Sequence, residues 1–156
     1  MKKIFSLIAI SAIAFAQQVF AQESKTIQIS LLNNYYNLKD ALVKSDLKIA
    51  SASAADLAAS ISSTDNAAIP EGNLKTLLKD VNAISAGKNL KEQRLHFAAL
   101  SANMVELAKT VKFSSDPVYQ QYCPMQKASW LSNNKAIKNP YYGNAMLTCG
   151  NVKATL

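Results

Sequence analysis

Apolar residues recur at helical spacing along residues 31–111. From Leu31 to Ile61 they lie three or four positions apart, with Ser, Asp and Lys on the remaining positions, which is the pattern of an amphipathic helix. Because no glycine or proline interrupts this stripe, it predicts one long helix. The polar residues that follow Ile61, and then Pro70 and Gly72, indicate the break at its end.

Two shorter helices are predicted after this break. The second begins near Asn73 and ends near Gly87, and the third runs from about Asn89 to Val111. Each has one apolar face, formed by Leu74, Leu77, Leu78, Val81 and Ile84 in the second helix and by Leu90, Phe97, Leu100, Met104 and Leu107 in the third. Helices with such faces pack together to bury them. The sequence therefore predicts a mainly α fold, an antiparallel bundle of three helices, the first long, within residues 22–113.

The pattern changes after Phe113. Residues 114–156 hold both cysteines, the tryptophan, three of the four prolines and two of the four glycines, which favours turns over long helices. The stretch Val118–Tyr122 alternates as a short strand does, and Met146–Leu156 fits either a helical turn or a strand. We expect a small turn-rich or β unit here that packs on the bundle, so that residues 22–156 form a single domain.

The start of the chain has the pattern of a secretory signal. Lys2 and Lys3 precede the apolar run Ile4–Ala16, and Val19-Phe20-Ala21 supplies small residues before an expected cleavage site. A membrane span needs about 20 apolar residues, and this run is shorter. We expect residues 1–21 to be a cleaved signal peptide. The mature protein is then periplasmic or secreted, without a stable membrane anchor.

Charge and motif content argue against two classes of function. The chain carries a formal net charge of +7, but no three basic residues are consecutive, whereas nucleic-acid-binding proteins concentrate Lys and Arg in a stripe. His96 is the only histidine, and neither a G-x-S-x-G motif nor a glycine-rich phosphate loop is present. The sequence therefore predicts neither a nucleic-acid partner nor an enzyme.

The sulfur-containing residues of the C-terminal unit are the strongest functional candidates. Cys123 and Met125 are two positions apart, which puts their side chains on one side of an extended backbone. Met146 and Cys149 are three apart, which puts them on one face of a helical turn. Thiolate and thioether sulfurs select Cu(I) over harder divalent ions. These four residues predict a soft-metal site, and His96 is an additional candidate ligand if the C-terminal unit folds over the face of the third helix on which His96 lies.

The same cysteines support a second interpretation. In an oxidising compartment two cysteines usually pair, and methionines usually fill gaps in a core. A Cys123–Cys149 disulfide would close a loop of about 27 residues and stabilise the fold by roughly 3.5 kcal/mol in the chain-entropy model. Spacing alone favours this disulfide-stapled structural or protein-interaction module over the metal site.

The sequence also resembles a bacterial domain-of-unknown-function family of exported proteins. Six segments carry the resemblance: Tyr35–Leu42, Gln93–Phe97, Tyr119–Met125, Ala128–Ser132, Ile137–Gly143 and Ala145–Gly150. Similar domains occur appended to periplasmic adaptor subunits of heavy-metal efflux systems. The Cys-Pro-Met string resembles the short metal-binding motif of such proteins, which often has a following histidine, where this chain has Gln126 and Lys127.

This resemblance implies copper or related metal handling, as a chaperone, a buffer or a partner of a metal efflux or delivery protein. It places Cu(I) binding ahead of the disulfide interpretation.

Overall fold

The computed structural model of the chain describes residues 26, 28–64 and 69–156. The expected signal peptide, residues 1–21, lies outside this part. A first helix over 28–43 is followed by three more helices, a three-stranded sheet and one 3₁₀ helix: α2 (Leu47–Ser62), α3 (Glu71–Ser85), α4 (Leu90–Ala108), β1 (Tyr119–Cys123), β2 (Ala128–Ser132), η1 (Gly143–Met146) and β3 (Asn151–Thr155). No helix in the described part is both long and apolar enough to cross a membrane. The mainly helical fold with strands confined to the C-terminal unit confirms the prediction in outline.

The predicted single long helix is wrong, because the chain turns at residues 44–46. Ser45 has a φ of 58°, in the left-handed region that ends a helix. Asp46 then caps α2, since its side chain accepts a hydrogen bond from the Ile49 N–H at 2.9 Å. The apolar stripe resumes in phase after this turn, so periodicity did not reveal it. The described residues therefore contain four α-helices, where three were predicted.

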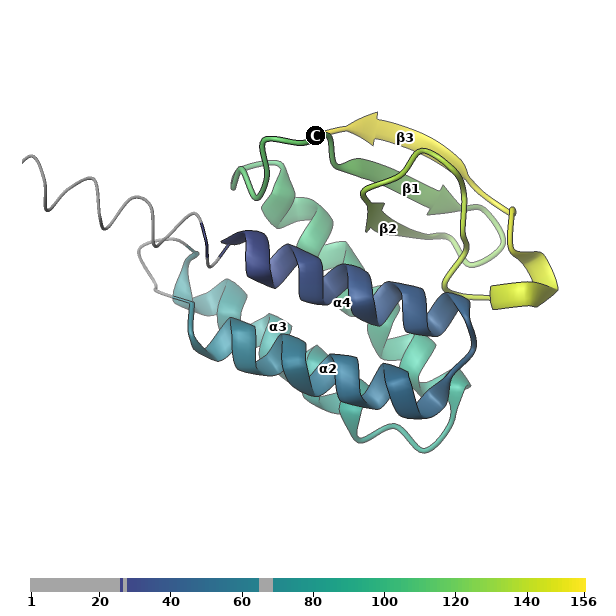
Figure 1. Cartoon of the computed structure of the whole chain (residues 1–156), viewed down its shortest axis with the longest axis horizontal. Helices are drawn as coiled ribbons and strands as arrows, with labels where there is room; N and C mark the ends of the chain where they lie inside the picture. The colour runs from purple at the N-terminus through teal and green to yellow at the C-terminus, as the bar shows by residue number, and fades with distance from the viewer. Residues whose placement is uncertain (1–25, 27, 65–68) are drawn as a thin grey trace, which may run out of the picture.

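The next two helices lie where the sequence predicted them. α2 packs on α3, and α3 packs on α4, while the first helix lies between α2 and the sheet (Figure 1). Asn89 caps α4 by accepting the Glu92 N–H at 3.0 Å, and Glu92 accepts the Lys88 N–H at 2.9 Å. This reciprocal cap fixes the start of α4, the helix that packs against β2.

The sheet has the order β2-β1-β3 and is antiparallel throughout. β1 and β2 form a hairpin in which Cys123 pairs with Ala128, so the loop between them is residues 124–127. Lys127 closes this loop with a φ of 54°, as the left-handed residue of such loops does. β1 was predicted, β3 was one of two alternatives for its segment, and β2 was not predicted.

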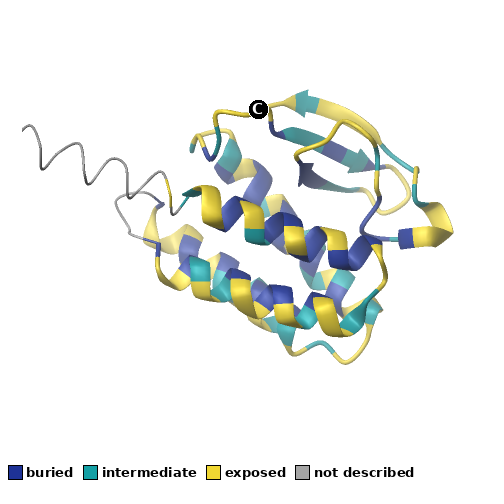
Figure 2. Ribbon diagram, in the orientation of Figure 1, coloured by how far each residue is buried: buried dark blue, intermediate teal, exposed yellow. Residues whose placement is uncertain are grey.

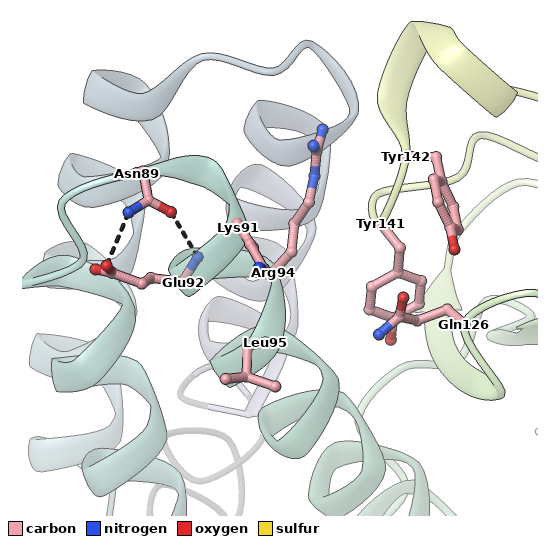
Figure 3. A pocket seen from close by; sticks show the side chains of 8 residues that line it. All are labelled: Asn89, Lys91, Glu92, Arg94, Leu95, Gln126, Tyr141 and Tyr142. Atoms are coloured by element: carbon pink, nitrogen blue, oxygen red, sulfur yellow. Dashed lines mark hydrogen bonds between the residues drawn. The ribbon is translucent and has the colours of Figure 1, made fainter.

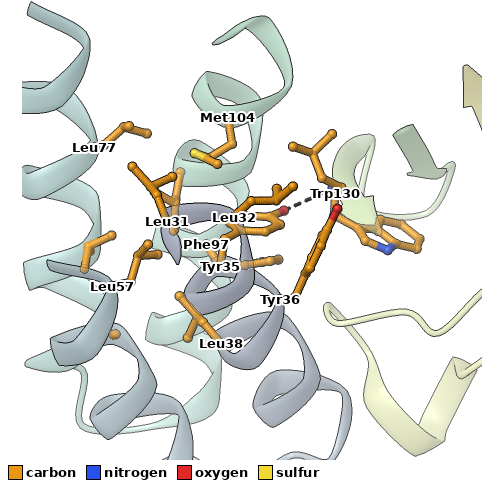
Figure 4. Packing of buried hydrophobic residues seen from close by; sticks show 14 of the residues in the cluster. Leu31, Leu32, Tyr35, Tyr36, Leu38, Leu57, Leu77, Phe97, Met104 and Trp130 are labelled. Carbon is orange, nitrogen blue, oxygen red and sulfur yellow. Dashed lines mark hydrogen bonds between the residues drawn. The ribbon is translucent and has the colours of Figure 1, made fainter. Parts of the chain in front are cut away.

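Bundle and sheet share one hydrophobic core. Figure 2 shows the buried residues on the facing sides of the helices and the sheet. Tyr35 stacks on Phe97 with ring centroids 5.5 Å apart, and Phe97 contacts Tyr141, which contacts Trp130. Figure 4 shows three elements meeting in this core. Tyr35 and Tyr36 come from the first helix, Phe97 comes from α4 and Trp130 comes from β2. The C-terminal unit is therefore held on the bundle by a continuous row of aromatic rings.

Arg94 of α4 joins three segments. Its Nη2 donates to the Leu42 carbonyl at 3.0 Å and to Ser45 Oγ at 2.8 Å, and its Nε donates to the Pro140 carbonyl at 2.9 Å. Gly143, with a φ of 55°, fits against the same turn, where a Cβ would lie 2.5 Å from Ser45 Oγ. The segment that leads to Cys149 is thus fixed to the bundle by one side chain and one close backbone approach.

Candidate functional site

The two cysteines come together at one end of the sheet. Cys123 is the last residue of β1 and is fully buried, whereas Cys149 precedes β3 and is partly exposed. Their Sγ atoms are 4.0 Å apart and both thiols are free. The pairing of β1 with β3 creates this proximity, because Tyr122 pairs with Asn151 and places the residues that follow and precede them side by side.

The backbone around Cys149 is held firmly against β1. Its carbonyl accepts a hydrogen bond from Asn139 Nδ2 at 2.7 Å, and its N–H donates to the Met146 carbonyl at 3.1 Å. Gly150 has a φ of 149°, and a Cβ there would lie 2.8 Å from the Tyr122 carbonyl oxygen, closer than real side chains approach. Only glycine lets the Cys149 segment come this near to β1.

The hairpin loop directs backbone N–H groups at the sulfurs. The Gln126 N–H donates to Cys123 Sγ at an N–S distance of 3.4 Å. Burial and the neighbouring Cys123 raise the pKa of the Cys149 thiol above its ordinary value, and the backbone N–H of Met125 opposes that rise. The loop thus places backbone N–H groups next to the pair, and a negatively charged sulfur can accept hydrogen bonds from them.

The two candidate methionines lie at the surface. Met125 is 62% exposed and Met146 is 39% exposed, whereas Met104 is fully buried in the core. Met125 sits in the hairpin loop, so the predicted extended arrangement with Cys123 is wrong. Met146 ends η1, and the turn to Cys149 is the helical turn that the spacing predicted. At such exposures these two methionines do not serve as gap fillers in the core.

His96 is not brought to the cysteines. It lies on α4, one turn after Glu92. Among the described residues, no group of three or more His, Cys, Asp or Glu side chains is placed to hold one metal ion. The C-terminal unit does fold over α4, but it covers the face that carries Phe97. The condition on which His96 was a candidate ligand is therefore not met at the cysteine pair.

The sulfur separation suits two kinds of chemistry. With metal–sulfur distances of about 2.3 Å, as in zinc thiolates, an angle near 120° at the metal would place two sulfurs about 4.0 Å apart. The observed distance equals that value. A disulfide instead requires about 2.05 Å between the sulfurs, which demands a further approach of about 2 Å. The pair can ligate a soft ion in its present geometry and can oxidise after a side-chain movement.

A family model described as a protein of unknown function (DUF3347) matches residues 31–116, more than half of the chain. The chain belongs to the DUF3347 family. No curated protein and no solved structure matches it. The DUF3347 match runs from the first helix through α4 into the loop before β1. The expected membership of a domain-of-unknown-function family is confirmed, and both cysteines lie beyond the matched residues.

A cleft of about 640 Å³ opens where the DUF3347 bundle meets the C-terminal unit (Figure 3). Its lining combines the first turns of α4 with the hairpin loop and the segment before η1: Asn89, Lys91, Glu92, Arg94, Leu95, Gln126, Tyr141 and Tyr142. Gln126 connects it to the cysteine pair, because the Gln126 N–H donates a hydrogen bond to Cys123 Sγ. Sequence reasoning missed this cleft. Lys91 and Glu92 have the pattern of a solvated helix face, and only the 64% exposure of Leu95 sets this surface apart.

Proposed function

We propose that this DUF3347 protein is an exported, non-enzymatic carrier or buffer of a soft metal ion, Cu(I), with the ion held between Cys123 and Cys149. The observation that carries the proposal is the 4.0 Å separation of two free cysteine sulfurs. These residues are 26 positions apart in sequence, and sheet pairing together with Gly150 brings them together. The strand pairing and Gly150 are therefore specific backbone features that bring the two sulfurs close together.

The donor set favours Cu(I) over zinc. Structural zinc sites use four ligands drawn from Cys, His and carboxylates, and within the described residues no third side chain of these types joins the pair. Two thiolates are sufficient for a soft monovalent ion. The exposed thioethers of Met125 and Met146 are the further soft donors available, and they act as weaker ligands at the rim of the site.

The sequence supports the cellular setting of this proposal. The pattern of Lys2, Lys3 and the apolar run after them supports export. The resemblance of the cysteine-containing segments to domains appended to metal efflux adaptors supports a periplasmic location. A metal efflux or metal-delivery protein is then the partner that would receive the ion from the partly exposed Cys149.

A second function rests on the same distance. Oxidation of the pair would give a Cys123–Cys149 disulfide that staples the C-terminal unit, leaving a structural or protein-interaction module without a metal. The row of aromatic contacts between Phe97, Tyr141 and Trp130 already unites unit and bundle. We therefore rank this function second. Counting free thiols in protein purified without reductant separates the two forms.

A competition titration tests the proposed site. Reduced protein, kept anaerobic, is titrated with Cu(I) in the presence of a Cu(I)-selective chromophoric chelator, and with Zn(II) against a zinc indicator. We expect one Cu(I) per chain and at least about 100-fold preference for Cu(I) over Zn(II), because two thiolates match a soft ion. Cys123→Ser and Cys149→Ser should each remove nearly all Cu(I) retention.

The methionines provide a matched control. Met125→Leu and Met146→Leu should each weaken Cu(I) binding by about 3- to 10-fold if the thioethers complete the site. Met104→Leu makes the same change in the buried core and should leave the affinity unchanged. Weak Cu(I) retention that is equal in wild type and both serine variants would reject the metal site.

A further inference from the structure

The two thiols of the pair differ sharply in access. Cys123 is 0% exposed, whereas Cys149 is partly open to solvent. A small molecule in solution can therefore reach the Cys149 sulfur but not the Cys123 sulfur. Because the sulfurs are only 4.0 Å apart, any group that becomes attached to Cys149 lies within reach of Cys123. In thiol–disulfide exchange the accessible thiol attacks first and the protected thiol resolves the mixed disulfide, and this difference in access suits Cys149 to the first role and Cys123 to the second.

The surrounding backbone permits closure of the pair without unfolding. Asn139 and Met146 hold the carbonyl and the N–H of Cys149, so the main chain stays in place while the side chain turns. Closure requires the sulfurs to approach from 4.0 Å to about 2.05 Å. A change of side-chain rotamer at Cys149 moves its sulfur by more than this difference.

The hairpin loop supports negative charge on the resolving sulfur during such a reaction. The Gln126 N–H already donates a hydrogen bond to Cys123 Sγ at 3.4 Å. Each step of thiol–disulfide exchange has a thiolate that attacks and a thiolate that leaves. Fixed N–H donors stabilise such negative sulfur without reorganisation.

We propose that the pair performs ordered thiol–disulfide exchange, in which Cys149 attacks an external small-molecule disulfide and Cys123 resolves the mixed disulfide. In the first step the Cys149 thiolate forms an S–S bond with one sulfur of the external disulfide, whose other half leaves as a thiolate. In the second step the Cys123 thiolate attacks Cys149 Sγ and expels the remaining half. Two cysteine thiols become one disulfide, one external disulfide becomes two thiols, and the two protons pass to the leaving thiolates.

The exchange itself requires no metal, but it has a consequence that rests on the proposed function. Closure consumes both thiolates, so the oxidised protein lacks the ligands that hold Cu(I). Reduction by a thiol restores them. The redox state of small thiols in the compartment would then determine how much metal the protein carries.

The test uses metal-free, reduced protein in the presence of a chelator, with glutathione disulfide as oxidant. Samples are quenched by acid and alkylation at short intervals, and intact masses and peptide maps are recorded. Wild type should lose two hydrogens and show only a transient glutathione adduct, located on Cys149. Cys123→Ser should accumulate this adduct, and Cys149→Ser should form an adduct at least ~10-fold more slowly because Cys123 is buried.

Several outcomes would overturn the proposal. These are equal adduct rates in the two serine variants, a wild-type adduct located on Cys123, a stable wild-type adduct that never resolves, or disulfide-linked dimers as the main product. Far-ultraviolet circular dichroism of each variant checks that the helices are retained, and the wild-type peptide map gives the answer without any variant. Because metal is absent throughout, failure here leaves the Cu(I) titration unaffected.

Discussion

The hydroxyl group of Tyr35 accepts a hydrogen bond from the backbone N–H of Leu131 at 3.1 Å, although the two residues are 96 positions apart. The same hydroxyl pairs with Ser101 Oγ at 2.7 Å. One side chain of the first helix thus connects the free edge of β2 to α4. Tyr141 acts in the same way at this edge, because its hydroxyl donates to the Ser129 carbonyl at 2.6 Å. Two tyrosines therefore satisfy polar groups of an edge strand that would otherwise be open.

This arrangement predicts a contrast between adjacent tyrosines. Tyr35→Phe leaves the Leu131 N–H and Ser101 Oγ without this partner in the core and should lower the free energy of unfolding by about 2–3 kcal/mol. Tyr36→Phe removes a buried hydroxyl that has no hydrogen-bond partner among the described residues, so it should change stability by less than about 0.5 kcal/mol or increase it slightly. Urea denaturation of the reduced protein at pH 7 measures both. Equal losses would refute the role assigned to Tyr35.

The sequence predicts the helices more fully than the turns between them. The apolar stripe that ends at Ile61 predicts helix over the residues of α2, and the stripes that follow from Leu74 onward predict α3 and α4. These predictions succeed because each helix has one buried face. The break at Ser45 escaped prediction because it contains neither glycine nor proline. Ser45 is useful there, since its Oγ accepts a hydrogen bond from Arg94. The helix-capping residue Asp46 was the signal in the sequence that could have revealed this break.

The cysteine pair illustrates the limit for the site. Residue spacing identified Cys123 and Cys149 as candidate site residues. Their proximity depends on the register between β1 and β3, which no local sequence pattern encodes. β2 was missed for a related reason, because Trp130 and Leu131 are both buried. Its interior residues therefore lack the alternation of a half-exposed strand. Met125 was misplaced because the hairpin loop begins directly after Cys123.

Two glycines predict opposite effects of the same substitution. Gly143→Ala places a Cβ 2.5 Å from Ser45 Oγ and 2.9 Å from the Val43 carbonyl oxygen, at a φ of 55°, and should lower stability by about 2 kcal/mol or more. Gly72 lies in the first turn of α3 with nothing within 4 Å of its Cβ position. Gly72→Ala should raise stability by up to about 1 kcal/mol. Thermal denaturation of both variants provides the comparison, and a loss at Gly72 would contradict it.

Buried tyrosines predict a loss of stability at alkaline pH. Burial raises the pKa of Tyr35 and of Tyr36 well above the ordinary value of about 10. Above that value the unfolded chain releases these protons while the folded chain keeps them, so the folded state loses stability as pH rises. Each tyrosine contributes up to about 1.4 kcal/mol per pH unit.

Chemical denaturation between pH 8 and 11 measures this slope. Tyr36→Phe should reduce the slope by about 0.7 kcal/mol per pH unit at pH 10 and by about 1.2 kcal/mol per pH unit at pH 11, with little change in stability at pH 7. A slope that Tyr36→Phe leaves unchanged would show that other groups cause the alkaline loss.

Arg94 predicts how tightly the C-terminal segment is tied to the bundle. Its guanidinium donates to Leu42, Ser45 and Pro140, and a lysine ammonium cannot reproduce this planar set of donors. Arg94→Lys should therefore lower stability by about 2 kcal/mol, since three acceptors lose their partner. Lys91→Met is a matched control, because Lys91 lines the same cleft from an exposed position and should shift stability by less than about 0.5 kcal/mol.

Hydrogen exchange shows where the effect of Arg94 is felt. The Tyr141 and Gly143 amides donate to the Asn139 side chain and carbonyl, at 2.8 and 3.0 Å. These bonds lie next to Pro140, the residue that Arg94 holds. Arg94→Lys should accelerate exchange at these two amides more than at the amides within α3, because local opening of the segment becomes easier. A uniform acceleration across the molecule would mean instead that Arg94 stabilises the fold as a whole and does not specifically anchor the segment leading to Cys149.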